Sequence, residues 1–405
     1  MRKRNDDIFP SKDPVKKALF IPKILLESTN LWPEKRTPFA KITNWIFLFL
    51  CIFIESGQIA FVIRNIKDIT RIASAMSTVS TTFQAITKLS VLYIYSNKLK
   101  SVLWLIWHEF WPAEIAGPRI EQQLKSYNTI IIHASVVMFI SGVSFAFGFL
   151  SAPLRTGTRI LPFESVYPFD WSGSPLYEII YVTEWITNIA FIVVGICGHD
   201  YLFLGICSNI VAQYTLLRAT FNSLGAANIE ETNRRILDSN TEPLKRRENE
   251  KLLERCIAHH VMLTDVCEEV AHIFSFSCFV QLFSSVTALC VAALIMTFAE
   301  IDVTLFTAVS AYLFGHLLQL FLFCTLGNEV TSHAGELATS IFCSEWYNIE
   351  GISLKKDLLF VMDKARREVK ISALGILALN YETFIGVLKL SFSFYTMLSK
   401  ASGHK

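Results

Sequence analysis

Residues 40–63, AKITNWIFLFLCIFIESGQIAFVI, decide the fold class of this chain, because Lys41 and Glu55 are their only charged residues. A helix needs about 20 mostly apolar residues to cross the hydrocarbon core of a bilayer, and this stretch has them. Six further stretches have the length and character of a span, at residues 70–95, 129–151, 177–198, 270–298, 303–327 and 371–399. We therefore predict an all-α membrane protein with seven transmembrane helices.

The composition of the whole chain also indicates a place in the lipid bilayer. Of its 405 residues, 52% are hydrophobic and 18% are charged, whereas about 25% of a soluble domain is charged. A net charge of +2 without a basic patch argues against a nucleic-acid partner. Glycine-rich phosphate loops, HExxH and GxSxG motifs and zinc-ligand spacings are absent. We therefore expect no enzyme, no cofactor and no metal site.

Three of the predicted spans are unusual. The second is polar, with several hydroxyls, Gln84 and Lys88, and should face protein or a wet cavity rather than lipid. The fourth continues as the apolar stretch 199–217; we favour one long helix that bends and leaves the bilayer, the alternative being an eighth short span. The pair His199-Asp200 is interpreted as a satisfied polar pair. The seventh exceeds the bilayer thickness as a helix, so its first turns should lie outside the membrane.

The distribution of lysine and arginine predicts the orientation. Positively charged residues accumulate in the cytoplasmic loops of membrane proteins. The tail and loops on the N-terminal side hold 27 of them, and the opposite side holds six. We therefore place the N-terminus inside and the C-terminus outside, in an inverted topology. The predicted organisation is a cytoplasmic N-terminal tail (1–39), a transmembrane domain (40–400) and an extracellular C-terminal tail (401–405). Within the transmembrane domain, the cytoplasmic helical segments 214–269 and 328–370 form an anchor layer.

Polar and aromatic residues in spans two, three, four and six predict a ligand pocket. Tyr181, Trp185 and Asn188 lie at positions i, i+4 and i+7 and so share one helical face. A mostly apolar pocket with a few polar groups is typical of sites for small organic molecules, although interhelical packing is the alternative for each position. Residues 152–176 should form an ordered lid over the bundle. The candidate ligand-binding residues are Ser77, His133, Val137, Tyr181, Trp185, Asn188, Tyr312 and His316.

The seventh span carries a narrow polar stripe. At 100° per residue its polar and small residues fall within about 80° of one another. Such a stripe on an apolar helix is typical of a pore-lining helix, and a helix buried in the bundle explains it equally well. The stripe consists of Glu382, Gly386, Lys389, Ser393, Thr396 and Lys400, with Gly375 and Met397 on or beside it.

Three motifs give the chain a resemblance to the insect odorant receptor family. They are LPFESVYPFD followed by SPLYEIIY within residues 161–181, CSEWY at 343–347, and NYETFIGVLKLSFSFYTML at 380–398. The order of seven spans and long inner loops resembles the family over the whole chain. The ending departs from the family pattern, since it has SFSFYTML in place of a sequence like SYSYFTLL. A proline common before span seven is also absent, and Val369-Lys370-Ile371 stands there.

The resemblance implies a ligand-tuning subunit of an odorant-gated, non-selective cation channel in the plasma membrane of sensory-neuron dendrites. Such a subunit would bind a small volatile organic molecule and assemble with the odorant co-receptor into a heterotetramer. Together with the stripe, it implies that Ser393, Thr396, Met397 and Lys400 line the pore. A gustatory-type receptor channel and a metabotropic seven-helix receptor are the alternatives. A G-protein-coupled receptor would place its N-terminus outside, and the sequence has no DRY or NPxxY motif.

Overall fold

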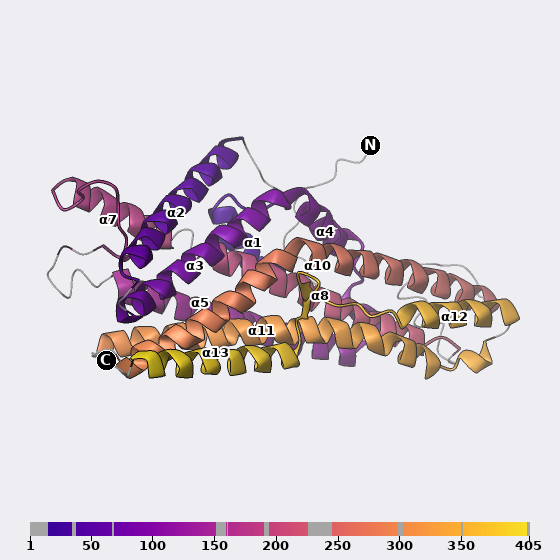
Figure 1. Cartoon of the computed structure of the whole chain (residues 1–405). Helices are drawn as coiled ribbons and strands as arrows, with labels where there is room; N and C mark the ends of the chain where they lie inside the picture. The colour runs from indigo at the N-terminus through magenta and orange to yellow at the C-terminus, as the bar shows by residue number, and fades with distance from the viewer. Residues whose placement is uncertain are drawn as a thin grey trace.

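The computed structural model of the chain describes residues 15–34, 38–66, 69–150, 159, 161–189, 194–225, 245–298, 303–349 and 351–402. Within these residues the fold is helical except for one two-stranded hairpin (Figure 1). The principal elements are α1 (Phe20–Ser28), α2 (Pro38–Arg64), α3 (Ile69–Ile94), α4 (Ser96–His108), α5 (Pro118–Leu150), α7 (Leu176–Thr187), α8 (Val194–Asn222), α10 (Lys245–Phe298), α11 (Val303–Phe342), α12 (Ile352–Ala365), β1 (Ser372–Ala373), β2 (Leu377–Ala378) and α13 (Tyr381–Ser402), with short 3-10 helices at Lys16–Leu19, Ala113–Ala116 and Trp346–Asn348.

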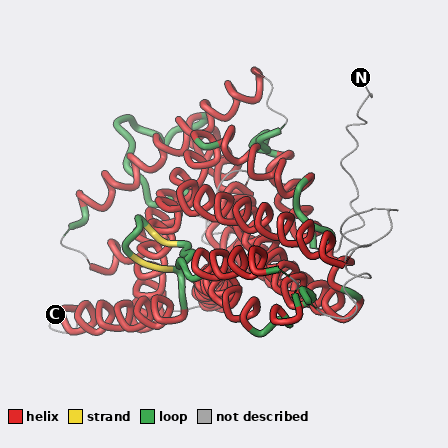
Figure 2. Tube along the Cα trace, turned by 90° about the vertical axis from the view of Figure 1, so that its right-hand side faces the viewer, coloured by secondary structure: helices red, strands yellow, loops and turns green. Residues whose placement is uncertain are grey.

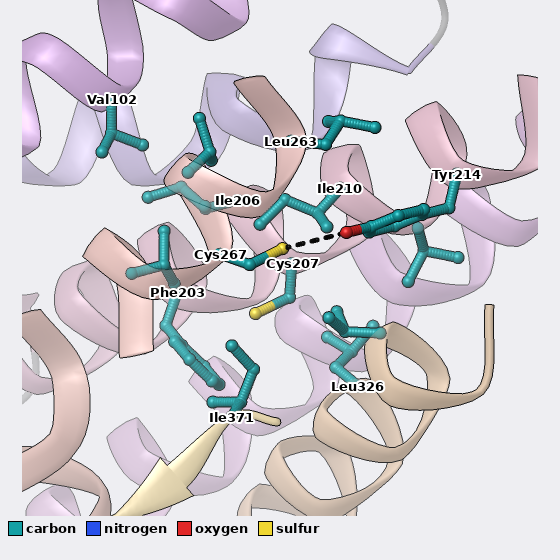
Figure 3. Packing of buried hydrophobic residues seen from close by; sticks show 14 of the residues in the cluster. Val102, Phe203, Ile206, Cys207, Ile210, Tyr214, Leu263, Cys267, Leu326 and Ile371 are labelled. Carbon is teal, nitrogen blue, oxygen red and sulfur yellow. Dashed lines mark hydrogen bonds between the residues drawn. The ribbon is translucent and has the colours of Figure 1, made fainter. Parts of the chain in front are cut away.

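Helix α8 is the centre of the bundle. It packs against α1, α3, α5, α10 and α11, and nearly all of its side chains are buried. Figure 3 shows part of this core, in which Phe203 and Ile210 of α8 lie among residues of α10 and α11. The Tyr214 hydroxyl lies 3.9 Å from the Cys267 sulfur there. The predicted tail is structured between residues 15 and 34, because its two short helices pack on α8.

Five of the described helices are long and apolar enough to cross a membrane, namely α2, α5, α8, α10 and α11. The outer sides of α2 and α5 expose large apolar residues such as Phe49 and Ile140, which suits contact with lipid. Most of the described polar side chains of α3 are buried instead, including Gln84 and Lys88, which confirms that the second span faces protein. Helix α8 runs unbroken through the predicted boundary at residue 199. Residues 190–193, between α7 and α8, lie outside the described part, so one long bent helix for the fourth span stays a prediction.

The seventh span begins later than the sequence predicted. Residues 371–379 form a hairpin rather than helical turns, with β1 paired antiparallel to β2 (Figure 2). Leu374 and Gly375 adopt positive φ angles of 53° and 70° in its turn, and the Leu379 amide donates to the Ile371 carbonyl at 2.9 Å. Helix α13 then starts where the Asn380 side chain accepts from the Thr383 amide at 2.8 Å. Gly375 therefore does not belong to the helical stripe.

The predicted anchor layer is formed by extensions of the membrane helices. Helices α10 and α11 each run without a break from a predicted span into a predicted inner loop. Helix α12 packs against both at the end of the molecule opposite α7 (Figure 1). Residues 226–244 of the predicted inner loop at 214–269 and residues 403–405 of the C-terminal tail lie outside the described part.

Candidate ligand-binding site

A cavity of about 100 Å³ lies between α3, α5, α8 and α11. Its wall is mostly apolar and includes a few hydroxyl and amide groups, a composition typical of sites for small organic molecules. The four helices and the end of α7 match the spans from which the sequence predicted a pocket. The lining residues are Thr78, Thr81, Thr82, Gln84, Met138, Ser141, Gly142, Phe145, Ala146, Phe163, Asn188, Ile196, Cys197, Ala311, Tyr312, Gly315, His316 and Gln319.

The described part of the predicted lid is residue 159 and residues 161–176, and Phe163 of this segment lines the cavity. Buried Glu184 of α7 holds this segment, since it accepts the Tyr167 hydroxyl at 2.6 Å and the Phe163 amide at 3.2 Å. Burial, with the Glu184 carboxylate as a second cause, raises the pKa of Tyr167, so its hydroxyl remains the donor. On the other side the Val166 amide donates to the Gly57 carbonyl at 3.0 Å.

Gly57 of α2 allows this close approach of the lid. A Cβ atom there would lie 3.1 Å from Cε1 of Tyr167 and 3.3 Å from Cβ of Ser165, which is tighter than ordinary van der Waals contact. Tyr167 also stacks on Phe53 with ring centroids 5.4 Å apart. The lid is therefore fixed to α2 by its backbone and aromatic face, and to α7 by hydrogen bonds.

Replacing Tyr167 with phenylalanine should loosen the lid. The change removes the donor to a buried carboxyl group, and an unmade buried hydrogen bond costs about 1–3 kcal/mol. We expect a lower thermal midpoint of the purified protein and faster proteolysis between residues 161 and 169. Tyr347→Phe is the matched control because Tyr347 is 62% exposed. Equal thermal midpoints for both variants would show that Glu184 does not hold the lid.

The structure places the predicted ligand residues unevenly. Asn188, Tyr312 and His316 line the cavity. Ser77 lies just behind the wall, where its carbonyl accepts the Tyr312 hydroxyl at 3.4 Å.

His133, Val137, Tyr181 and Trp185 lie outside the cavity, contrary to the prediction. His133 and Val137 are exposed on α5, Tyr181 is only half-buried, and Trp185 is 40% exposed. The period of a helix tells which residues share a face and leaves open which face turns inward. In α7 the inward face carries Glu184, Thr187 and Asn188, and in α5 it carries Met138, Ser141 and Gly142.

Residues of α11 that sequence reasoning missed include Gln319 and the small pair Ala311 and Gly315. Gln319 could have been found from the sequence, because Tyr312, His316 and Gln319 follow the spacing i, i+4, i+7 in an otherwise apolar helix. The cavity residues Ile196 and Cys197 of α8 had no such signal, since both are apolar and end the apolar stretch 189–197.

A buried ion pair lies next to the cavity. The Lys88 ammonium is 2.6 Å from Oδ1 of Asp200, and both side chains are fully buried. Asp200 also bonds to the His199 ring at 3.0 Å and accepts from the Gln319 amide. The prediction that the His199-Asp200 pair is hydrogen-bonded is confirmed for the aspartate. Its main partner is Lys88, which the sequence analysis did not identify.

Amide side chains link this ion pair to the cavity wall. Lys88 donates to the side-chain oxygen Oε1 of Gln281 at 2.8 Å, and the same oxygen accepts from the side-chain amide of Gln84, which lines the cavity. Gln319 forms the second link from the wall to Asp200. In the part of the chain that the structure describes, no cluster of His, Cys, Asp or Glu is arranged to hold a metal.

The polar stripe of α13 lies on the open side of that helix. Ser393, Met397 and Lys400 are exposed and Thr396 is half-buried. The opposite face packs against α10 and α11, and its Tyr395 hydroxyl lies 3.1 Å from the Thr297 hydroxyl. Within a single chain, therefore, the stripe is not a contact buried in the bundle.

Comparison with known proteins gives consistent matches. A family model described as 7tm Odorant receptor matches residues 68–392. Among curated relatives, Odorant receptor Or1 of Anopheles gambiae is 22% identical and covers 93% of each chain. Odorant receptor 10 of Aedes albopictus is 25% identical over 71% of this chain and 73% of its own length.

A solved structure has the same fold. The insect olfactory receptor OR5 from Machilis hrabei superposes with a TM-score of 0.76 at 20% identity, covering 95% of this chain and 97% of its own. A second structure of that receptor, in complex with eugenol, gives a TM-score of 0.74 at 18% identity, with 96% and 97% of the two chains covered. The chain thus has an all-α, seven-transmembrane-helix fold shared with receptors rather than with enzymes.

Proposed function

Because the chain belongs to the 7tm odorant receptor family, we propose that it is the ligand-tuning subunit of an odorant-gated, non-selective cation channel. The observation that carries the proposal is the lidded, largely apolar cavity between α3, α5, α8 and α11. A small volatile organic molecule would bind there, since burial of its apolar surface stabilises the complex. The solved relative in complex with eugenol supports a small organic ligand.

The proposed setting is the plasma membrane of a sensory-neuron dendrite, with the N-terminus inside and the C-terminus outside. The lysine and arginine distribution supports this orientation. The chain would assemble with odorant co-receptor subunits into a heterotetramer. The layer of α12 and the extended ends of α10 and α11 offers a surface for those contacts, with exposed apolar residues such as Ile352, Leu359 and Phe360.

The proposed pore is lined by α13, including Ser393, Thr396, Met397 and Lys400. Exposure of the stripe in a single chain supports this, because a pore-lining face meets water and other subunits rather than its own bundle. An apolar residue such as Met397, 58% exposed, would hold a constriction dry, and its polar neighbours would rehydrate it when the helices separate.

The test is an electrical recording from cells that express the chain with the co-receptor and without added G protein. If the chain is a channel subunit, odorants evoke a cation current, and this chain determines which odorants do so. A current that requires G protein would show a metabotropic receptor, and a full current without any co-receptor would favour a gustatory-type channel.

A C-terminal epitope tag should be labelled on unpermeabilised cells, whereas labelling of an N-terminal tag would overturn the orientation.

Cysteine substitutions can test the pore-lining face. We expect Ser393→Cys and Met397→Cys to react with a thiol reagent applied from outside during odorant stimulation. Ser391→Cys is the matched control, because Ser391 is only 4% exposed on the packed side of α13. Lys400→Glu should raise relative divalent permeability, since it exchanges repulsion for attraction at the mouth; screening there limits the effect to about 1 kcal/mol. If the cysteines at 393 and 397 do not react and the reversal potential is unchanged in Lys400→Glu, this face of α13 does not line the pore.

A further inference from the structure

Most polar groups in the cavity wall already have protein partners. The hydroxyls of Thr78, Thr81 and Ser141 donate to carbonyls of their own helices at 2.8–2.9 Å. The amides of Gln84 and Gln319 belong to the network around the Lys88–Asp200 ion pair. A ligand would therefore compete with existing bonds at each of these side chains.

Two polar atoms of the described cavity wall are different. Nδ1 of His316 and Oγ1 of Thr82 are buried and have no hydrogen-bond partner in the protein. Their residues are only 8% and 1% exposed, and both line the cavity. A threonine within a helix usually donates to a carbonyl three or four residues earlier, as Thr81 does, so the unpartnered Thr82 is an exception beside a regular neighbour. Buried polar groups are generally hydrogen-bonded, so an occupant of the cavity is the candidate partner. Neither atom has accessible surface in the structure, so each side chain has to turn toward the cavity to meet it.

The chemistry of the two atoms indicates which functional group would satisfy them. A threonine hydroxyl both donates and accepts, and a neutral histidine nitrogen does one or the other according to its tautomer. A hydroxyl group can hydrogen-bond to either histidine tautomer, because it also donates and accepts. A carbonyl or ether oxygen can bond only to the tautomer in which this nitrogen is the donor, and a methyl group of the same size can bond to neither.

The size and walls of the cavity limit the rest of the ligand. A cavity of roughly 150 Å³ holds benzene, and this one measures about 100 Å³. A small aliphatic alcohol therefore fits as the cavity stands, and a single compact ring is the upper limit, which enters only when the wall yields slightly. Phe145 and Tyr312 stack with centroids 4.5 Å apart and provide an aromatic surface for such a ring.

We propose that the cavity selects a compact alcohol or phenol whose hydroxyl group bonds to His316 and Thr82. This inference rests on the proposed function and specifies the ligand class of the same site. An ordered water molecule is the competing occupant; these two groups would give it the lower end of the two to four partners typical of buried water.

The test compares probes and variants that differ by one hydroxyl. The full chain, purified in lipid nanodiscs, is titrated with phenol and with toluene, which has a methyl group in place of the hydroxyl, and the dissociation constants are taken from thermal stabilisation. The variants are Thr82→Val and His316→Phe. Thr87→Val is the matched control, because the buried Thr87 of α3 donates to the Phe83 carbonyl at 3.0 Å and lies outside the cavity lining. Thr82→Val keeps the side-chain shape, so it decides the question even where His316→Phe fails to fold.

We expect the preference for phenol over toluene to fall roughly tenfold in Thr82→Val and His316→Phe, as for loss of one hydrogen bond, and to persist in Thr87→Val. An unchanged preference in both variants would show that water satisfies the two atoms and would overturn the inference. An equal loss in Thr87→Val, or no binding of either probe, would overturn it too. The proposed function fails separately, if a broad odorant panel evokes no current from co-expressed wild-type chains.

Discussion

Replacing Lys88 with methionine is expected to remove most of the folded protein from the cell surface. The substitution keeps the length of the side chain and leaves the fully buried Asp200 without its cation. Removing one partner of a buried ion pair costs about 3–5 kcal/mol, and the whole stability of a typical protein is about 5–15 kcal/mol. The thermal midpoint of the solubilised protein and the surface-labelled fraction measure this loss.

Two further variants separate charge from packing. Lys88→Met combined with Asp200→Asn should recover much of the loss, because the asparagine is neutral and retains hydrogen-bonding groups for His199 and Gln319. Lys98→Met is the control, since its ion pair with Glu269 is partly exposed, at 3.0 Å with 46% and 34% of the side chains accessible. Such pairs contribute at most about 1 kcal/mol. If Lys88→Met and Lys98→Met have equal thermal midpoints, the buried pair does not hold the bundle together.

The arrangement of helices was predictable from the sequence because lipid imposes a simple rule on composition. A stretch such as 40–63 has to be apolar over its length, so α2 was evident without knowledge of its neighbours. The lid was predicted at residues 152–176 from its proline, glycine and aromatic residues, and among its described residues Phe163 lines the cavity. The polar character of α3 indicated that it faces protein, as its buried Gln84 and Lys88 confirm.

The cavity was only partly predictable, because the inward face of each helix depends on its neighbours. His316 and Tyr312 were identified, being polar residues in an apolar helix, but the same criterion selected His133 and Trp185, which are exposed. An amphipathic residue at the edge of a span suits lipid as well as a ligand, so residue type alone does not separate the two.

Long-range pairings were the least predictable feature. Lys88 and Asp200 are separated by 112 positions, and no local pattern relates them. The hairpin before α13 has only two residues in each strand, so its apolar sequence resembles the start of the following helix. It is held by tertiary contacts, such as the Leu374 amide donating to the Ser275 hydroxyl at 2.9 Å.

Filling the cavity from α5 should abolish the odorant response while leaving the fold intact. A Cβ atom at Gly142 would meet nothing within 4 Å, and Gly142 lines the cavity. Gly142→Leu would therefore place a branched side chain in the space that the ligand needs. Removing a glycine from a helix interior also favours the helix by up to about 1 kcal/mol, so the amount of protein at the surface should not fall.

The expected result is a graded loss of sensitivity in the co-expressed channel. Gly142→Ala should shift the dose–response curve slightly, and Gly142→Leu should shift it a hundredfold or more, equivalent to about 2.8 kcal/mol of lost binding. Gly335→Leu is the matched control, because Gly335 of α11 also has open space around it and lies outside the cavity lining. A normal dose–response curve in Gly142→Leu would mean that odorants bind elsewhere. A loss in Gly142→Leu with a normal Gly335→Leu would place ligand recognition in the space between α5 and α11, since only the substitution at Gly142 occupies it.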